Sequence, residues 1–389
     1  MTHLSSLKLD RIRRLLSTGR TTVLGAGPMS RTFTEIVINE ANRVAKPILL
    51  IPSRRQVDSE AEGGGYVENW TSSEFCRFVR ERDVGSFVVL ARDHSGPWQG
   101  HPPIGATLES EWERTAASLE DDVRSGFDII HCDPSPALQH GASESDVINL
   151  AVSMAIRVQE LSDLVGREVG IEVGTDEQVQ GVDSLSKTFE RAREVSKAFR
   201  DNKLALPLYY VAQTGTKVSG TRNCGVVASG LVPKRKIHPY AVLESTAKGL
   251  ESIGMGLKVH NGDYLSTEVL RWHRRLGLHA MNVAPEYGVT EARFLVSLAE
   301  RLGLREPLEL WSTEVWEGGQ WKRWAEPSES VNLPRAVELA GHYHFATEKG
   351  VHLREETARA LRSKGENFDA QLRDVLSRSL RRYTTAFGY

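Results

Sequence analysis

One stretch shows the organisation of this chain most clearly: FVVLARDHSGPW, residues 87–98. Its apolar first half is typical of a short buried strand. Asp93 and His94 stand where that strand ends, and a Gly-Pro pair then turns the chain away. In parallel α/β folds the catalytic groups lie at the carboxyl ends of strands, so the stretch predicts a proton-transfer group beside a metal ligand. The alternative is that Asp93 caps a turn and His94 lies on the surface.

The same alternation of apolar runs and helical patterns continues along the chain. We predict strands at 21–24, 47–51, 87–91, 127–131, 168–173, 208–212, 256–259 and 278–283. We predict helices at 30–44, 71–83, 108–125, 144–164, 185–201, 238–253, 265–275 and 290–302. Eight strand-then-helix units over about 280 residues favour a closed (β/α)8 TIM barrel, an α/β fold, over a doubly wound open sheet.

Regions outside these units complete the predicted architecture. Residues 4–17 look like an amphipathic helix ahead of the barrel, so we assign 1–304 to the barrel with this helix. Residues 305–389 read as a helical C-terminal extension that packs on the barrel or on a second subunit, and a homo-oligomer is expected. Four tryptophans of the extension are expected to be packing anchors around a turn at 317–320. Thr71 to Glu74 predicts a capping box, and Thr290 and Glu291 are expected to open the last barrel helix.

Composition limits the kind of partner. The chain has 389 residues, 40% hydrophobic and 26% charged, with a formal net charge of −2. This charge gives no reason to expect nucleic acid or an anionic membrane as a partner, and no apolar run could cross a bilayer. Cys76, Cys132 and Cys224 lie far apart and form no CxxC motif. Because the N-terminus also lacks the apolar core of a secretory signal, we expect a cytoplasmic protein.

Polar residues recur where the predicted strands end. Two histidines and a carboxylate from separate strands can hold a catalytic divalent metal, zinc above all, with a position left open for substrate. His94, Glu172 and His260 are the predicted ligands, and His131 is an alternative ligand. Asp93 and Asp133 are the predicted catalytic acid or base.

Long loops follow three of the predicted strands, at 53–69, 174–183 and 214–233. All three would lie on the catalytic face, where glycine-rich turns commonly bind phosphate. The residues expected to bind phosphate or substrate are Gly215, Thr216, Lys217, Asn261, Asp263 and Asn282. Arg54, Arg55, Arg222, Lys234 and Arg235 could add positive charge. A Schiff base on Lys217 is the less favoured alternative, because its loop is polar.

Several of these motifs, taken together, resemble a known family. DHSGPW at 93–98, GFDIIHCDPS at 126–135, IEV at 171–173, and KVHNGDY at 258–264 are similar to motifs of the tagatose-bisphosphate aldolase accessory subunit, often labelled tagatose-6-phosphate kinase. QVD at 56–58 and GGY at 64–66 fit a loop of the same family. The match covers roughly residues 20–302 in order.

That family is itself similar to the zinc-dependent class II fructose- and tagatose-bisphosphate aldolases. The resemblance implies that Asp93 is a catalytic acid with the zinc ligand His94 beside it, that His260 is another zinc ligand, and that Asn282 begins a phosphate-binding strand end. One departure is clear: the aldolases carry a third zinc histidine in a segment that here, at 215–220, has none. Zinc would then require Glu172 or another group.

These observations lead to one main hypothesis and two alternatives. The main hypothesis is a class II aldolase-like enzyme that acts on a phosphorylated sugar or related ketose, by retro-aldol cleavage, condensation or epimerisation through an enediolate. The resemblance also implies an alternative, a non-catalytic subunit that stabilises a separate class II aldolase. The other alternative is a sugar-phosphate binding protein without chemistry. No kinase signature is visible in the sequence.

Overall fold

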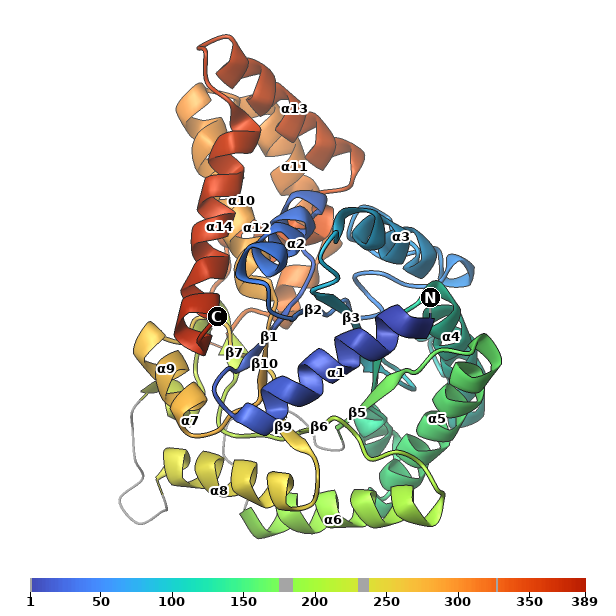
Figure 1. Ribbon diagram of the computed structural model, residues 1–389. Coiled ribbons are helices and arrows are strands. Elements are labelled where there is room, and N and C mark those ends of the chain that lie inside the picture. The colour runs from blue at the N-terminus through green and yellow to red at the C-terminus, as the bar shows by residue number, and fades with distance from the viewer. Residues whose placement is uncertain (1, 175–184, 230–237, 327) are drawn as a thin grey trace.

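A computed structural model describes residues 2–174, 185–229, 238–326 and 328–389 of the protein. Its centre is a closed barrel of eight parallel strands, which confirms the predicted TIM barrel (Figure 1). Around the barrel the order is β1, β2, β3, β4, β5, β6, β9, β10 and back to β1. The strands are β1 (Val23–Ala26), β2 (Ile48–Leu50), β3 (Val88–Ser95), β4 (Ile129–Cys132), β5 (Gly170–Gly174), β6 (Tyr209–Val211), β9 (Gly256–Val259) and β10 (Ala280–Val283).

The predicted helices all appear, one ahead of the first strand and one after each of the eight strands. They are α1 (Thr2–Thr18), α2 (Arg31–Val44), α3 (Ser72–Arg82), α4 (Leu108–Ser125), α5 (Glu144–Val165), α6 (Leu185–Asp201), α8 (Pro239–Ser252), α9 (Thr267–Arg275) and α10 (Pro285–Leu302). The capping box at Thr71 and Glu74 is present. The expected opening of the last barrel helix at Thr290 is wrong, because α10 begins with Pro285, whose ring suits the first helical position.

Short elements fill the loops. A two-stranded hairpin of β7 (Val218–Ser219) and β8 (Arg222–Asn223), followed by α7 (Val226–Ser229), lies in the long loop after β6. The 3-10 helices η1 (Glu60–Glu62) and η2 (Ser135–His140) follow β2 and β4. Residues 175–183 of the predicted loop after β5 lie outside the described residues.

The barrel interior is apolar at its amino-terminal end. There the α1 side chains Leu9 and Ile12 pack with Val23, Leu49 and Val89 from three strands, all fully buried. Helix α1 therefore lies across this end of the barrel (Figure 1). With one end closed by apolar packing, the loops at the carboxyl end provide the access to the barrel.

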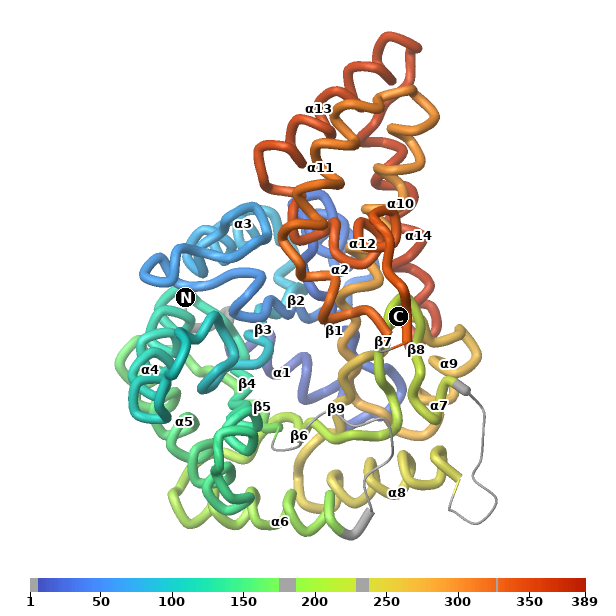
Figure 2. Tube along the Cα trace, turned by 180° about the vertical axis from the view of Figure 1, so that it is seen from behind, coloured from blue at the N-terminus to red at the C-terminus, as the bar shows by residue number. Residues whose placement is uncertain are grey.

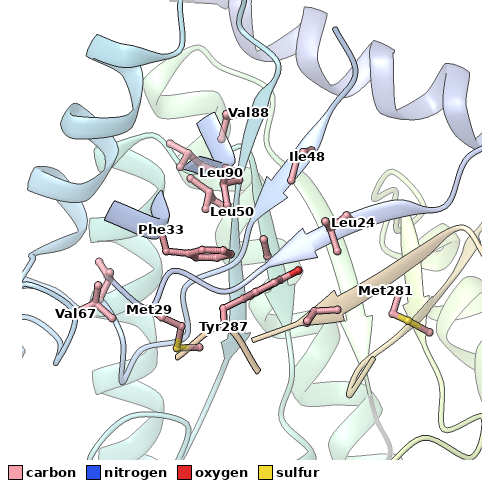
Figure 3. Close-up of a cluster of buried hydrophobic side chains, with 14 of the residues drawn as sticks. Leu24, Met29, Phe33, Ile48, Leu50, Val67, Val88, Leu90, Met281 and Tyr287 are labelled. Atoms are coloured by element: carbon pink, nitrogen blue, oxygen red, sulfur yellow. The ribbon is translucent and has the colours of Figure 1, made fainter. Parts of the chain in front are cut away.

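A second apolar cluster joins the outer faces of β1, β2 and β3 to the surrounding helices (Figure 3). Phe33 of α2 and Tyr287 of α10 stack with their ring centroids 4.2 Å apart at its centre. Because α2 follows the first strand and α10 the last, this contact also seals the junction at which the barrel closes.

The C-terminal extension is helical, as predicted. It contains α11 (Arg305–Gly318), η3 (Gln320–Arg323), α12 (Leu333–Ala340), η4 (Gly341–His344), α13 (Glu348–Arg362) and α14 (Phe368–Phe387). Helices α11 and α13 project away from the barrel, and α14 returns along α10 and α2 (Figure 2). The 1–304 and 305–389 division remains a prediction. Among the described helices, none combines the length and apolarity needed to span a bilayer.

The end of the chain contacts its beginning. The backbone N–H of Leu24 in β1 donates to the Tyr389 hydroxyl, which in turn donates to the carbonyl of Pro47; both distances are 2.8 Å. The N–H of Thr22 donates to the Phe387 carbonyl at 3.1 Å. The end of α14 and the residue at the end of the chain are therefore bonded to the first barrel strand and to the residue just before it.

Candidate metal centre and substrate cavity

The end of β3 departs from regular strand geometry. Up to Arg92 it pairs regularly with β4, but its next paired residue is Ser95, so β3 carries one extra residue at this point. His94 has a φ of 50°, in the left-handed region that non-glycine residues seldom adopt. Neighbours in a regular strand face opposite sides, whereas this bulge lets Asp93 and His94 both line one cavity. β3 therefore runs four residues beyond its predicted end.

Four side chains at the carboxyl end of the barrel form a buried cage of ligand-capable atoms. They are Asp93, His131, Glu172 and His260, each from a different strand or its end, with one atom of each lying within 4.8 Å of the others. His131 Nδ1 is 3.6 Å from Asp93 Oδ1 and 3.8 Å from Glu172 Oε1. His260 Nε2 lies at the same two distances from these oxygens.

These distances fit a metal ion. Ligands about 2.0–2.2 Å from a tetrahedral ion lie roughly 3.3–3.6 Å from one another, so small shifts would complete such a site. Glu172 Oε1 and His260 Nε2 are buried and lack hydrogen-bond partners among the residues that the structure describes. Because buried polar atoms are normally paired, these two atoms indicate a missing partner. The donor set of imidazole and carboxylate is one that zinc accepts.

A buried lysine lies directly beneath the cage. Lys258 Nζ is 2.7 Å from Glu172 Oε2, and about 1% of each side chain is exposed. Burial opposes the charge of Glu172, but Lys258 outweighs it and lowers the pKa of Glu172 to about 2. Burial likewise opposes the charge of Asp93, but His94, His260, His131 and Lys258 hold its pKa well below the usual range. Both carboxylates are therefore ionised at neutral pH.

His94 stands beside the cage and is held by a second carboxylate. Its Nδ1 lies 2.6 Å from Asp133 Oδ2, which also accepts from the Gln99 amide at 2.7 Å, while Asp133 Oδ1 accepts from the Ser135 N–H at 3.1 Å. Asp133 thus fixes the ring and leaves His94 Nε2 facing Asp93 Oδ2 at 3.7 Å. Burial lowers the pKa of His94, but Asp93 and Asp133 overcome it and raise this pKa to about 9.

The structure therefore distributes the predicted ligands over two groups. Glu172 and His260 belong to the cage, whereas His94 groups with His131 and Asp133. His131, expected only as an alternative ligand, is common to both groups. Gly174 gives it room, because a Cβ atom there would lie 2.7 Å from His131 Nε2.

The cage opens into a cavity of about 340 Å³. Asp93, His94 and His260 line it on one side. An adjoining cavity of about 310 Å³ lies toward the ends of β4, β5 and β6 and shares His94, His260 and Arg323 with the first. A volume of this size is in the range of small-molecule sites.

The predicted phosphate residues divide into two sets. Lys217, Asn261, Asp263 and Asn282 line the larger cavity. Thr216 is buried, and its hydroxyl donates to the His260 carbonyl at 2.7 Å, while Gly215 also lies off the cavity lining. These two residues support the loop instead of facing the cavity.

Two of the cavity residues have defined partners. The Asn282 amide donates to Asp93 Oδ1 at 3.1 Å, which orients that carboxylate. Asp263 Oδ1 accepts from the N–H groups of Ala284 and Glu286, both at 2.9 Å. Burial and the charge of Glu286 raise the pKa of Asp263 to about 7.

The basic residues expected to add charge behave differently from one another. Arg54 is buried and paired with Asp58 at 3.3 Å, and Arg222 pairs with Glu326 at the surface. Arg55 lines the larger cavity. Lys234 and Arg235 lie outside the described residues.

Several site residues were missing from the sequence prediction. Lys258 could have been found, because it stands two residues before His260 and a strand repeats its facing every second residue. Four others belong to the extension and line the larger cavity: Arg323, Trp324, His342 and Tyr343. Their sequence surroundings carry no signal that would link them to the barrel.

Comparisons with known proteins bear on the fold. No family model matches the sequence, and no curated protein matches it. A probable tagatose 6 phosphate kinase from Sinorhizobium meliloti 1021 superposes with a TM-score of 0.75 at 17% identity, over 94% of this chain and 100% of that one. The chain has the same barrel.

Two enzymes are similar to a lesser degree. A fructose-bisphosphate aldolase from Campylobacter jejuni matches with a TM-score of 0.55 at 11% identity, over 100% of this chain and 95% of that one. A fructuronate-tagaturonate epimerase from Cohnella laeviribosi matches with a TM-score of 0.54 at 13% identity, over 94% of this chain and 81% of that one. At these identities the likeness establishes a shared fold.

Proposed function

We propose that this chain is a metal-dependent enzyme of the class II aldolase type, acting on a phosphorylated sugar or related ketose. The reaction would be retro-aldol cleavage, its reverse, or epimerisation. The observation that carries the proposal is the cage of Asp93, His131, Glu172 and His260, with buried unpartnered atoms, beside an open cavity. The barrel shared with an aldolase and an epimerase supports the same class of reaction.

In this proposal His131, Glu172 and His260 hold a divalent metal, zinc being the first candidate. A divalent ion there would supply a Lewis acid that polarises the carbonyl of a ketose. Asp93 is the most exposed of the four cage side chains, at 13% against 5% or less for the others. It is therefore the group that can exchange a proton with a substrate in the cavity.

The neighbours of Asp93 support this role. Asn282 orients its carboxylate through the 3.1 Å hydrogen bond. His94, protonated while its pKa is near 9, offers a hydrogen bond to a substrate oxygen from beside Asp93. Asp133 is predicted as an acid or base, but its oxygens already accept three hydrogen bonds, so we assign it the positioning of His94.

One observation favours the second candidate, a non-catalytic subunit of a separate class II aldolase. Lys258 already neutralises one oxygen of Glu172, so the fold tolerates this carboxylate without an ion. A protein that had lost its metal would need such a cation. This candidate predicts stable association with an aldolase and no turnover by the chain alone.

Metal content of the purified protein decides between these candidates. The enzyme proposal expects close to one divalent ion per chain by elemental analysis, lost in His260→Ala. His131→Ala and His94→Ala form a matched pair: the first should lose the ion and the second should keep it. If His131→Ala retained the ion and His94→Ala lost it, the metal ligand would be His94, as the sequence predicted, and not His131. Wild-type protein that takes up no metal even when it is supplied would sink the enzyme proposal.

Substitution of Asp93 tests the chemistry separately. In Asp93→Asn the new side-chain oxygen can still accept the hydrogen bond from the Asn282 amide, and the protein should retain the ion. Turnover of a ketose phosphate should fall by about 10²–10⁴-fold, the usual contribution of a general acid or base. Near-normal turnover in this variant would refute the assigned role, whatever the metal content.

A further inference from the structure

The C-terminal extension forms part of the wall of the substrate cavity. Arg323 and Trp324 lie at the end of η3, and Tyr343 lies in η4; all three line the larger cavity together with Asp93 and His260 of the cage. The extension is anchored here, since the Gly220 N–H donates to the Trp324 carbonyl at 2.7 Å. The Trp324 indole also donates to the Tyr343 hydroxyl at 3.1 Å.

Three cations reach this cavity without a carboxylate partner among the residues that the structure describes: Arg55, Lys217 and Arg323. Their neighbours in sequence differ. Arg54, next to Arg55, pairs with Asp58 at 3.3 Å and with Glu62 at 3.7 Å. Arg54 therefore has its charge neutralised by carboxylates, whereas the charges of the three cavity cations are not neutralised by any carboxylate of the described residues.

The two arginines line the same cavity, and their like charges oppose each other. Burial, and next the charge of Arg323, lower the pKa of Arg55. Tyr66 and Tyr343 lie beside them, with ring centroids 4.5 Å apart, and burial raises the pKa of both hydroxyls. Like charges gathered with neutral hydroxyl donors make a recognition site for an oxyanion, because guanidinium groups bind phosphate and carboxylate through paired hydrogen bonds.

We propose that Arg55, Lys217 and Arg323 bind the terminal anionic group of the substrate, a phosphate ester or a carboxylate. The extension then contributes a specificity-determining residue, Arg323, to the barrel's own site. This inference rests on the proposed function, because it takes the cavity beside the cage as the place where substrate lies. The anionic end would lie against the extension while the reacting carbons face Asp93. Arg323 also lines the adjoining cavity, so it can reach ligands on either side.

Anion binding by the full chain tests the inference. Inorganic phosphate and D-gluconate serve as probes in titration calorimetry, on protein as purified and after treatment with a chelator, since phosphate could also bind an ion in the cage. Arg323→Ala and Arg55→Ala should each weaken binding by about tenfold or more in both preparations. Lys322→Ala is the matched control, because it removes an adjacent exposed charge that does not line the cavity. Its binding should equal that of the wild type.

Each outcome has a defined meaning. Stronger binding of phosphate assigns a sugar phosphate, and stronger binding of gluconate assigns a sugar acid; either result supports the site. Wild-type affinity in Arg323→Ala, or no measurable binding of either anion by the wild type, overturns it. Failure of the proposed enzyme function would look different: no metal and no turnover, with anion binding still dependent on Arg323.

Discussion

Two buried lysines occupy opposite ends of the barrel, and they differ in what they leave unpaired. Lys8 of α1 closes the amino-terminal end, where its Nζ lies 3.4 Å from Asp128 and 4.0 Å from Asp83. Lys258 lies under the cage at the carboxyl end, 2.7 Å from Glu172. Both lysines lie beside buried carboxylates and neutralise their charge.

The carboxylates around the two lysines are not equally satisfied. Asp128 accepts from the Leu90 N–H at 2.9 Å. Asp83 accepts from the N–H groups of Phe87 and Val88, where β3 begins. Glu172 keeps one buried oxygen without a partner among the described residues. The amino-terminal lysine therefore completes a stabilising network, whereas Lys258 leaves an atom free for a ligand. The unpaired oxygen of Glu172 thus points to ligand binding at the carboxyl end of the barrel.

The largest effect is expected from Lys258→Met. This change leaves Glu172 buried without its cation, so the metal-free protein should lose about 3–5 kcal/mol of unfolding free energy. A divalent metal should return part of it, about 2.7 kcal/mol at a hundredfold excess over Kd. Chemical denaturation with and without metal measures both effects.

A matched surface substitution controls for the loss of a lysine. Lys248→Met breaks an exposed pair with Glu244 on α8 and should cost under about 1 kcal/mol, with no response to metal. If Lys258→Met were as stable as this control, the buried pair of Lys258 and Glu172 would not contribute to stability. The proposed difference between the two ends of the barrel would then be wrong.

A smaller effect on stability, which depends on pH, is expected from Asp263→Asn. Asp263 is a buried carboxylate at the carboxyl end of the barrel and, among the described residues, has no lysine as an ion-pair partner. Burial and Glu286 raise the pKa of Asp263 to about 7, above its unfolded value of about 3.9. The folded state therefore holds this proton more tightly, and the contribution of Asp263 to wild-type stability should fall as pH rises from about 4 to 7. Asp263→Asn should remove this slope and gain on the order of 2 kcal/mol at pH 8.

Denaturation of chelator-treated protein at pH 5 and pH 8 measures this difference. Asp146→Asn is a suitable control, because Asp146 is an exposed carboxylate at the start of α5. Parallel stability curves for Asp263→Asn and wild type across this range would contradict the raised pKa.

The smallest effect is expected from Lys8→Met. Asp128 and Asp83 keep their backbone hydrogen bonds, so the cost should be about 1 kcal/mol, at the low end for a charged group that loses one partner. Metal addition should restore none of it, and metal content should match that of the wild type. If metal restored the unfolding free energy of Lys8→Met, the amino-terminal end of the barrel would respond to metal as the carboxyl end does, and the proposed difference between them would be wrong.

The fold was predictable because its signals are local. Each barrel strand is a short apolar run, and each is followed by a helix with capping residues or an amphipathic face, as at Thr71 for α3. The exceptions have local causes: β3 extends through a bulge around Asp93, and α10 starts at Pro285. A bulge leaves little trace in a sequence, because it depends on pairing with β4.

The site was predictable only in part. Strand ends pointed to Asp93, Glu172 and His260, and the topology brings these three together. The place of His131 in the same cage depends on ring orientation and on space beside Gly174, which the sequence does not specify. Arg323 reaches the cavity through tertiary packing of the extension, about sixty residues after the last cage residue.

The hydrogen bond between Leu24 and Tyr389 sets an order of events during synthesis. These residues are 365 positions apart in the chain. At about 5–20 residues per second, β1 leaves the ribosome some 20–70 s before its last partner exists. The Leu24 N–H therefore gains this partner only after residue 389 has been made. β1 can pair with β2 and β10 before then, so the contact with Tyr389 is added to a barrel whose eight strands have already been made.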